Sequence, residues 1–459
     1  MSPRIVGVVD IGKSNAKFAV VDLESRSELA VRKMPNAVLR DGPYPHYDVP
    51  ALWDFLRGSI ADLNREHPLD ALSVTTHGAS AALIDSEGAL TLPVLDYEFA
   101  GPDELAAEYD KARPDFSESF TPRLPAGLNL GAQLFWQARR YPDAFARTKW
   151  ILPYPQYWSY RLCGVAASEI TSLGCHTDLW NFETDLYSSL VLGEGWLEKM
   201  PQVRPAADVL GLVLPELAAR LGLRPHLPVH CGIHDSNASL LPHLLERQPP
   251  FSVVSTGTWV IVCTPGGDLS RLDPERDCLA NLDALGRTVP SARFMGGREF
   301  SQLVGDDPVV PHEAALARVL EDNVLLLPSV TEGSGPFPRR KAHWNKPAHT
   351  IDRETNFVGV SFYLAMMTAE CLSLTGAEGD VVVEGPFAAN RFYLRMLASA
   401  STQRVVAMTG SATGTSIGAA LLARMEAAGT GPRAAFHHFA GTPEMAAYAR
   451  RWRALVGQG

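Results

Sequence analysis

Cysteines are few in this sequence, with six among 459 residues. No two of them form a Cys-x-x-Cys pair, so their spacing predicts neither a zinc site nor a redox dithiol. Isolated thiols of this kind are typical of buried residues in a reducing compartment. They stand at Cys163, Cys175, Cys231, Cys263, Cys278 and Cys371.

Long apolar runs are also missing, and basic residues are outnumbered. No apolar run approaches the roughly 20 residues that a membrane-spanning helix needs. The first residues lack the charged, apolar and small-residue regions of a cleavable signal, which favours a cytoplasmic location. Lysine and arginine total 41 against 51 aspartates and glutamates, for a net charge of −10. This balance argues against a nucleic-acid or anionic-membrane partner, because such partners usually need a basic face.

Two common nucleotide-binding signatures are absent. The sequence has no Gly-x-x-x-x-Gly-Lys-Ser/Thr loop, and no helix directly follows the first strand as in a dinucleotide-binding fold. Three β-branched runs come first instead, and apolar spacing then predicts a helix at 51–65 and a strand at 71–75. The three runs are Ile5–Asp10, Ala16–Asp22 and Leu29–Pro35. The alternation of helix and strand that follows predicts an α/β fold.

The opening pattern returns in the second half of the chain. Phe251–Ser255, a turn of small residues and Trp259–Cys263 repeat the first hairpin, which predicts a duplicated fold with two lobes. We place the boundary in the proline-containing stretch 242–250, giving domains 1–245 and 246–459. Further helices are predicted at 131–139, 155–162, 390–400 and 415–428, and further strands at 380–384 and 404–408.

The first candidate site follows the first strand, at Asp10-Ile11-Gly12-Lys13-Ser14-Asn15-Ala16-Lys17. An aspartate at a strand end can hold Mg²⁺, usually through water, because Mg²⁺ prefers oxygen ligands and keeps much of its hydration shell. Gly12 would let the backbone approach a phosphate, and backbone amides, Ser14 and the two lysines offer hydrogen-bond donors. An ordinary polar hairpin turn is the alternative.

The second candidate lies in Gly232-Ile233-His234-Asp235-Ser236-Asn237-Ala238. Asp235 stands after a glycine turn and before a helix start, where a carboxylate could accept a proton from a substrate hydroxyl. The alternative is a helix N-cap, for which aspartate is a preferred residue.

Three weaker signals complete the set. The turn Ser255–Trp259 could bind phosphates through backbone and hydroxyl groups. The strand Val381–Glu384 ends at Gly385-Pro386, with Asn390 beyond, where a nucleoside could lie against bare backbone. His77-Gly78 follows a strand and could reach a sugar hydroxyl, with Tyr97 as a candidate pocket wall. The alternatives are a plain hairpin turn for 255–259 and a common strand-to-helix connection for 381–386. For His77 the alternative is a structural or surface histidine, and for Tyr97 it is ordinary aromatic packing.

In this order, the motifs resemble the FGGY family of carbohydrate kinases, in the actin, Hsp70 and hexokinase superfamily. The resemblance runs from about residue 5 to about residue 425. Pro228–Ala238 is similar to the family's Pro-Val-x-x-Gly-x-His-Asp-x-x-Ala segment, and Gln156–Gly164 to a first-domain segment. Ser255–Trp259 resembles the Ser-Gly-Thr-Trp turn of rhamnulose and fuculose kinases, and Gly418–Ala423 the family's C-terminal helix.

The resemblance implies a fold, cofactors and roles. It implies two ribonuclease H-like (actin-like ATPase) domains with an inter-domain cleft, ATP and Mg²⁺ as cofactors, and often a homodimer. Asp235 would be the catalytic base, and Mg²⁺ would be organised by Asp10 with Asp235 as a second candidate. The nucleotide contacts would be Gly12, Lys13, Ser14, Lys17, Thr256, Gly257, Thr258, Gly385 and Asn390. The sugar contacts would be His77, Gly78, Tyr97 and Asp235.

Departures from the family pattern leave the substrate open. Lys13 and Ser14 replace the usual threonines after Gly12, Pro386 replaces a glycine, and 94–100 lacks the arginine expected near the sugar. The leading prediction is ATP-dependent phosphorylation of a small ketose, with 6-deoxyketohexoses such as L-rhamnulose or L-fuculose favoured by the second turn. Kinases of a pentulose, a tetrulose or glycerol are alternatives within the family. A sugar-sensing protein that has lost transfer, or a sugar-independent ATPase on this fold, are alternatives of other classes.

Overall fold

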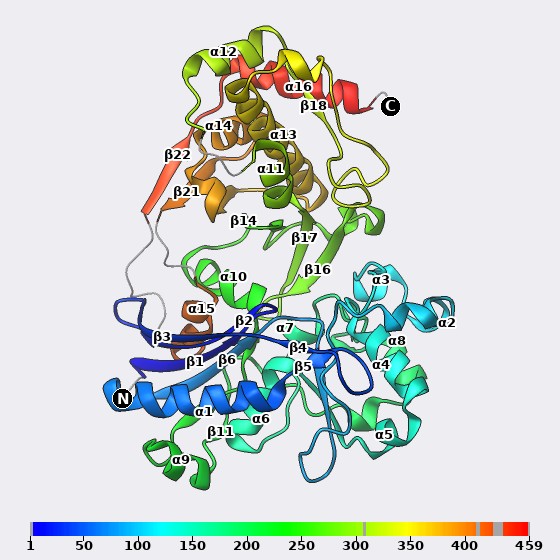
Figure 1. Cartoon of the computed structure of the whole chain (residues 1–459), viewed down its shortest axis with the longest axis vertical. Coiled ribbons are helices and arrows are strands. Elements are labelled where there is room, and N and C mark those ends of the chain that lie inside the picture. The colour runs from blue at the N-terminus through cyan, green and yellow to red at the C-terminus, as the bar shows by residue number, and fades with distance from the viewer. Residues whose placement is uncertain (1–2, 306–308, 410–413, 426–434, 458–459) are drawn as a thin grey trace. The chain divides into compact units, whose positions relative to one another are not determined.

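The computed structural model describes residues 3–305, 309–409, 414–425 and 435–457 (Figure 1). The chain divides into two compact units. The first holds 1–247, 280–288 and 411–433, and the second holds 248–279, 289–410 and 434–459. The chain crosses from the first unit at residue 247, and two later segments return to it.

A mixed sheet forms the centre of the first unit, in the order β11-β12-β6-β1-β2-β3, with β13 also paired to β6. β1 and β2 are antiparallel, whereas β1 and β6 are parallel. Its strands are β1 (Ile5–Ile11), β2 (Asn15–Asp22), β3 (Ser27–Pro35), β6 (Ala71–Thr76), β11 (Val209–Leu212), β12 (Pro228–His230) and β13 (Ile233–His234). β1 and β6 are almost entirely buried, which explains their continuous apolar and β-branched sequences.

Helices cover both faces of this sheet. On one face lies α1 (Val49–Glu66), where Asp48 accepts a hydrogen bond from Ala51 N and Leu52, Leu56, Ile60 and Leu63 are buried one turn apart. α6 (Tyr154–Cys163) and α9 (Pro215–Leu221) join it. The other face is covered by α10 (Asp235–Glu246) and by α15 (Thr415–Leu421), which returns from near the end of the chain.

A largely helical region with its own apolar core follows the first sheet strands. Its helices are α2 (Ala106–Ala112), α3 (Phe116–Ser119), α4 (Leu130–Arg140), α5 (Pro142–Arg147), α7 (Ile170–Leu173) and α8 (Ser189–Gly193). The short strands of the first unit are β4 (Val38–Leu39), β5 (His46–Tyr47), β7 (Ala81–Ile84), β8 (Trp150–Pro153), β9 (Trp180–Asn181) and β10 (Leu186–Tyr187). Leu282, from the returning segment 280–288, belongs to this core.

The second unit repeats the connectivity of the first sheet, in the order β16-β17-β15-β14-β20-β21-β22. Its strands are β14 (Phe251–Thr256), β15 (Val260–Cys263), β16 (Cys278–Leu282), β17 (Thr288–Phe294), β20 (Asp380–Glu384), β21 (Val405–Thr409) and β22 (Ala435–Phe439), with β18 (Leu326–Leu327) and β19 (His343–Trp344) apart. The end of β16 and the first residue of β17 belong to the segment 280–288 that is grouped with the first unit. β14 is antiparallel to β15 and parallel to β20, as β1 is to β2 and β6. This shared pattern confirms the predicted α/β fold with two ribonuclease H-like domains.

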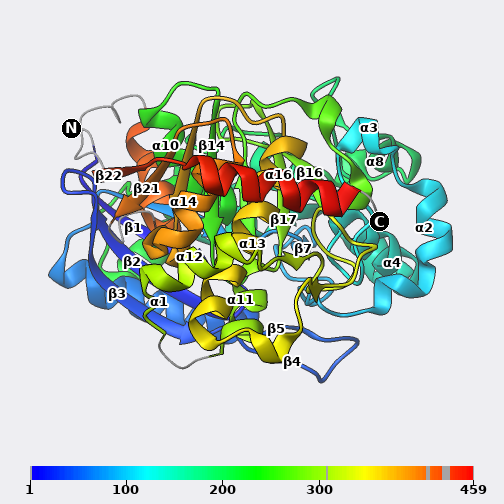
Figure 2. The same cartoon turned by 90° about the horizontal axis from the view of Figure 1, so that it is seen from above.

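The helices of the second unit surround one long central helix. They are α11 (Gly296–Val304), α12 (Glu313–Glu321), α13 (Arg353–Leu374), α14 (Arg391–Ala400) and α16 (Pro443–Gly457). α16 lies across α12 and α14 (Figure 2). Among the described residues, α13 alone is long and apolar enough to cross a membrane, but 83% of its apolar window is buried in the structure. Contacts with α11, α12 and α14 account for that burial.

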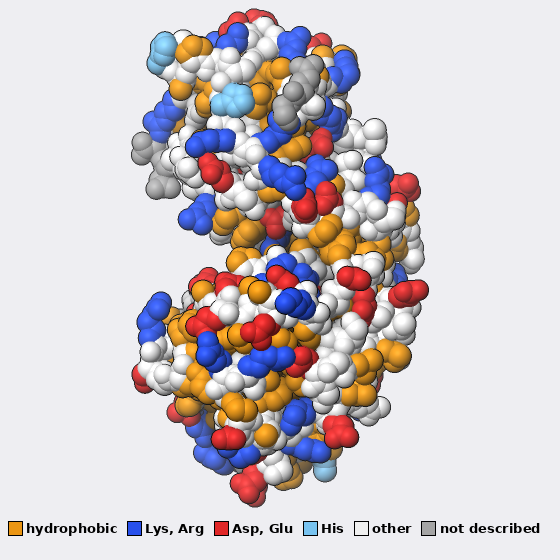
Figure 3. Space-filling model, turned by 90° about the vertical axis from the view of Figure 1, so that its right-hand side faces the viewer, with side chains coloured by type: hydrophobic (Ala, Val, Ile, Leu, Met, Phe, Trp, Pro, Cys, Tyr) orange, Lys and Arg blue, Asp and Glu red, His pale blue; other side chains and the backbone are white. Residues whose placement is uncertain are grey.

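Most predicted elements are confirmed to within two residues at each end. The helix predicted at 415–428 is shorter: α15 ends at Leu421, and 426–428 lie outside the described residues. No disulfide joins any of the six cysteines, which all lie within the described residues, and all but Cys263 are buried. On the face in Figure 3, basic and acidic side chains are interspersed over both units rather than gathered by sign.

Candidate active site

Two aspartates flank the end of β6 in the first unit. Asp10 on β1 pairs in register with Thr75 of β6, and Ile233 on β13 pairs with the same Thr75 from the other side. The backbones of Asp10 and Ile233 are therefore two strand spacings apart, or about 10 Å. Asp235 follows two residues after Ile233, so the first and second candidate motifs meet at one sheet edge.

Asp10 lies in a partly neutralised, nearly buried position. Lys17 Nζ is 3.3 Å from Asp10 Oδ2, and Ser416 Oγ donates to the same oxygen at 3.0 Å. Burial raises the pKa of Asp10; Lys17 opposes that rise, and the nearby charge of Asp235 adds to it. Two carboxylates that repel each other favour a cation beside them, so the donor set fits the oxygen preference of Mg²⁺. Sequence reasoning missed Ser416, because only the return of α15 brings it to β1.

The loop after Asp10 is a tight hairpin in which some polar groups already form hydrogen bonds within the protein. Gly12 N donates to Asn15 O at 2.9 Å, and Asn36 Nδ2 donates to Gly12 O at 2.9 Å. Ser14 is exposed. The predicted phosphate contacts of Gly12 and Ser14 stay predictions.

Lys13 points toward the segment 96–98. Its ammonium pairs with Asp96, lies 3.2 Å from Glu98 Oε2, and is 4.7 Å from the centre of the Tyr97 ring. The structure thus brings a cation from the first loop to the very segment that lacks the expected arginine. The sequence predicted that Lys13 contacts the phosphates. A local pattern could not predict its pairing with Asp96, because 83 positions separate the two residues.

Asp235 is the first residue of α10 and is held at a sharp turn. Gly232 has φ +93°, and a Cβ there would lie 2.8 Å from Val74 O, so the turn requires glycine. The N-cap alternative is wrong: His234 occupies the N-cap position, and Asp235 Oδ1 accepts a hydrogen bond from Ser236 N at 2.6 Å. Its side chain is 32% exposed, yet the surrounding protein raises its pKa above the usual range.

His77 lies beneath this edge, enclosed by aromatic rings. Its Nδ1 donates to Gly78 O at 2.8 Å, and its ring centre is 5.4 Å from that of Tyr97. His77 Nε2 is buried and makes no hydrogen bond to any residue that the structure describes. Burial lowers the pKa of His77 to about 4, so the ring is neutral near pH 7. A Cβ at Gly78 would lie 2.6 Å from His234 Nε2, so a larger residue there would have to displace that ring.

In the second unit, the turn after β14 packs against the strand end of β20. Thr256 Oγ1 donates to Glu384 O at 2.5 Å and accepts from Phe387 N at 3.0 Å. Gly385 has φ +79°, and a Cβ there would lie 2.1 Å from Thr256 O. The third and fourth candidate motifs are therefore neighbours, although Thr256 uses its hydroxyl within the fold.

The remaining residues of these two motifs differ in exposure. Gly257 and Thr258 are exposed, whereas Asn390 caps α14 by accepting from Phe392 N and Tyr393 N, both at 3.1 Å. Pro386 begins a short 3₁₀ turn over 386–389. Nucleotide contacts by these residues stay predictions.

Two family models together match most of the chain. The FGGY family of carbohydrate kinases, N-terminal domain, matches residues 5–242, and the carbohydrate kinase FGGY, C-terminal domain, matches residues 248–432. Among curated proteins, L-fuculokinase of Escherichia coli strain K12 is 24% identical over 276 residues, or 57% of each chain. The chain thus spans a little more than half the length of the curated relatives it matches.

Solved structures match over the whole chain. A carbohydrate kinase from Novosphingobium aromaticivorans is 33% identical with a TM-score of 0.91, over 100% of this chain and 99% of the other. A structure titled as a xyloylose kinase from Brucella ovis has a TM-score of 0.80 at 21% identity, over 99% of both chains, which shows a shared fold. With one family model on more than half of its residues and the second on most of the rest, this chain belongs to the FGGY family of carbohydrate kinases.

Proposed function

We propose that this protein transfers the γ-phosphoryl group of ATP to a hydroxyl of a small ketose. The observation that carries the proposal is the placement of Asp10 and Asp235 on either side of the β6 end, in a chain of the FGGY family. Phosphoryl transfer depends mainly on positioning and on neutralising charge, and a sheet edge with two carboxylates and a lysine supplies both.

Asp235 is the proposed general base. Burial raises the pKa of Asp235, so its carboxylate holds a proton more readily than an exposed one. Placed within hydrogen-bond reach of a primary hydroxyl, it would accept that proton as the oxygen attacks phosphorus in line. A base of this kind typically contributes about 100- to 10,000-fold to the rate. The neutral His77 ring would remain a hydrogen-bond partner rather than a competing acid.

Asp10 and Lys17 are the residues of the first unit that would hold the metal and phosphates. Mg²⁺, when bound with ATP, would neutralise charge on the phosphate oxygens. Asp10 would bind that ion through water, and Lys17, 3.3 Å from Asp10, would balance the remaining charge. In the second unit, the exposed backbone of Gly257 and Thr258 is the candidate phosphate contact, and Gly385 the candidate adenosine contact.

The sugar would contact His77, Gly78 and Tyr97, with Lys13 supplying the cation of that region. A 6-deoxyketohexose, L-rhamnulose or L-fuculose, is the leading substrate, in line with the relatives named L-fuculokinase. A pentulose is the closest competitor, because another relative is named probable L-xylulose kinase. A cytoplasmic location and a homodimer stay predictions from the sequence.

ADP release with a panel of ketoses, glycerol and no acceptor tests the proposal. We expect release that depends on one ketose class. Asp235→Asn should lose at least 100-fold in kcat while ATP binding is kept, and Asp62→Asn, on the exposed side of α1, should behave as wild type. Near-normal turnover by Asp235→Asn would refute the assignment of Asp235 as the general base. ADP release that does not depend on any acceptor would refute the proposal that the protein is a sugar kinase.

A further inference from the structure

Three potential metal ligands meet in the first unit beside the proposed base. One ligand atom each from Cys175, His176 and His234 can be chosen so that all three lie within 4.8 Å of one another. Cysteine spacing alone predicted no such site, since the third ligand comes from a strand 58 positions further along the chain.

The fold brings these residues together at the end of α7. The helix stops at Gly174, where a Cβ would lie 2.8 Å from the Leu282 side chain. The chain then turns through Cys175 and His176, whose φ is +43°. His234 reaches the same place from β13, opposite Thr76 of β6.

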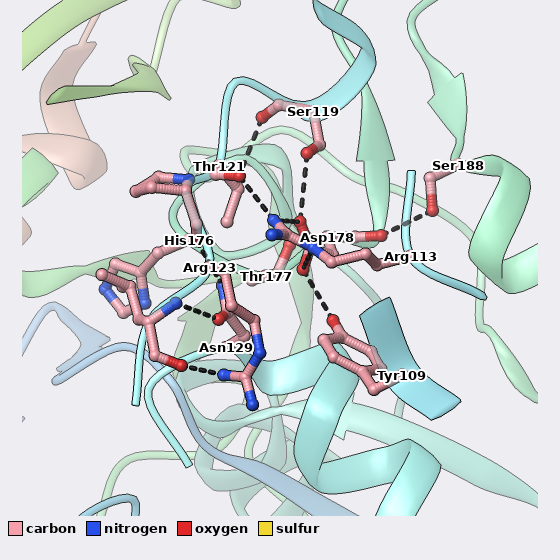
Figure 4. Close-up of polar contacts among 12 residues, drawn as sticks. Tyr109, Arg113, Ser119, Thr121, Arg123, Asn129, His176, Thr177, Asp178 and Ser188 are labelled. Carbon is pink, nitrogen blue, oxygen red and sulfur yellow. Dashed lines mark hydrogen bonds and ion pairs between the residues drawn. The ribbon is translucent and has the colours of Figure 1, made fainter. Parts of the chain in front are cut away.

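A buried ionic network holds the turn in its strained conformation (Figure 4). Asp178, two residues after His176 and also left-handed at φ +61°, is fully buried. Its carboxylate accepts from Tyr109 Oη at 2.6 Å, from Ser119 Oγ at 3.1 Å and from the Arg113 guanidinium at 3.0 and 3.1 Å. Metal sites require ligands held by such a supporting shell, because loose side chains cannot keep the geometry.

The two imidazoles differ in the hydrogen bonds that their nitrogens make. His176 Nδ1 lies 2.8 Å from Leu128 O and donates to it, which leaves Nε2 of His176 as the acceptor nitrogen. Nδ1 of His234 is buried and makes no hydrogen bond within the described part of the chain. Burial lowers the pKa of His234 to about 4, so its ring is neutral near pH 7.

We propose that Cys175, His176 and His234 form a binding site for a borderline divalent ion of the Zn²⁺ class, and that its occupation inhibits phosphoryl transfer. One thiolate and two imidazoles suit Zn²⁺, Co²⁺ or Cd²⁺ far better than Mg²⁺, which prefers oxygen. In tetrahedral Zn²⁺ coordination, ligand atoms lie about 3.5 Å apart. Side-chain rotations that move the ligand atoms by roughly 1 Å would therefore bring them to coordination distance. Three protein ligands leave a fourth position for water.

Inhibition follows from the neighbour of His234, and this part rests on the proposed function. His234 Nε2 is 3.3 Å from Asp235 Oδ1. An ion on the His234 ring places a divalent charge one side chain away from Asp235. Binding would also turn the His234 ring toward Cys175 and His176, and Asp235, which is in contact with that ring, would be drawn out of line with the substrate hydroxyl.

Titration of the full chain with Co²⁺ tests the site without reference to catalysis. We expect one ion per chain and a thiolate-to-cobalt charge-transfer band. Cys175→Ser and His176→Gln should abolish the band, and Cys163→Ser, which removes an equally buried thiol of the same unit, should keep it. His176 is the less buried ligand, so its variant serves if Cys175→Ser does not fold. Absence of the band in wild type, or its survival in Cys175→Ser, would overturn the site.

The inhibitory role is tested by adding Zn²⁺ to the ADP-release assay. The Zn²⁺ concentration for half inhibition should rise at least 10-fold in Cys175→Ser and stay unchanged in Cys163→Ser. Unchanged turnover while Zn²⁺ displaces bound Co²⁺ would overturn the inhibitory role. A chain that binds Co²⁺ as expected but phosphorylates nothing would refute the proposed function and leave the site standing.

Discussion

The neutral, buried His234 should make the protein acid-sensitive, and the size of the effect follows from its pKa. Burial lowers that pKa from 6.5 to about 4, a difference of about 2.5 units. At 1.36 kcal/mol per unit, the histidine would cost about 3 kcal/mol of stability once the pH has fallen below both values. The sign follows from proton binding: between pH 6.5 and about 4 the unfolded chain holds the extra proton. The free energy of unfolding therefore falls as the pH falls through this window.

His234→Gln removes the titrating group and is the test. The free energy of unfolding is measured with urea between about pH 4.5 and 7.5. Over this range it should change by roughly 2 kcal/mol less in His234→Gln than in wild type. His349→Gln, in an exposed turn of the second unit, controls for the loss of an imidazole as such. If the pH curves of wild type and His234→Gln run parallel, the burial argument for His234 is refuted.

Three further substitutions test particular contacts. Gly418→Ala, where a Cβ would lie 1.7 Å from a carbonyl oxygen of α10, should cost about 1–3 kcal/mol in urea unfolding, whereas Gly58→Ala on the open side of α1 should be neutral or stabilising; equal effects would contradict close packing of α15. Asp178→Asn keeps the tolerance for a left-handed backbone but leaves its arginine partner unpaired, so a loss of about 3–5 kcal/mol in the same measurement is expected and a loss under 1 kcal/mol would count against the network. Ser416→Ala removes a donor to Asp10 and should raise the Mg²⁺ concentration needed for half-maximal ADP release several-fold, and an unchanged Mg²⁺ dependence would deny Ser416 that role.

Much of the fold could be predicted because its signals are local. The β-branched run Ile5–Ile11 and the one-turn spacing of apolar residues in Val49–Glu66 each specify an element within a few neighbouring positions. Local patterns also placed Asp10 near the end of a strand and Asp235 between a glycine turn and a helix, close to where the structure has them. Two similar hairpins then predicted a duplicated architecture, which the matching strand orders of both sheets confirm.

Local patterns could not predict which distant side chains meet. Lys13 follows the first strand like a phosphate ligand, yet its ammonium pairs with Asp96, because the alternative would leave that nearly buried carboxylate without its cation. The alternative prediction that Asp235 is the N-cap was wrong by one position, because His234 is the N-cap. Gly232 sets where the turn ends and the helix begins.

The sequence by itself determined the elements, the duplicated fold and the candidate base, because each depends on residues close together in the chain. Only the tertiary structure decided that Ser416 donates to Asp10 across 406 positions, and that Cys175 and His176 meet His234. Those contacts depend on how α15 and the turn after α7 pack against the first sheet. Packing of that kind is set by the complementary shapes of buried surfaces, which leave no periodic signal in the sequence.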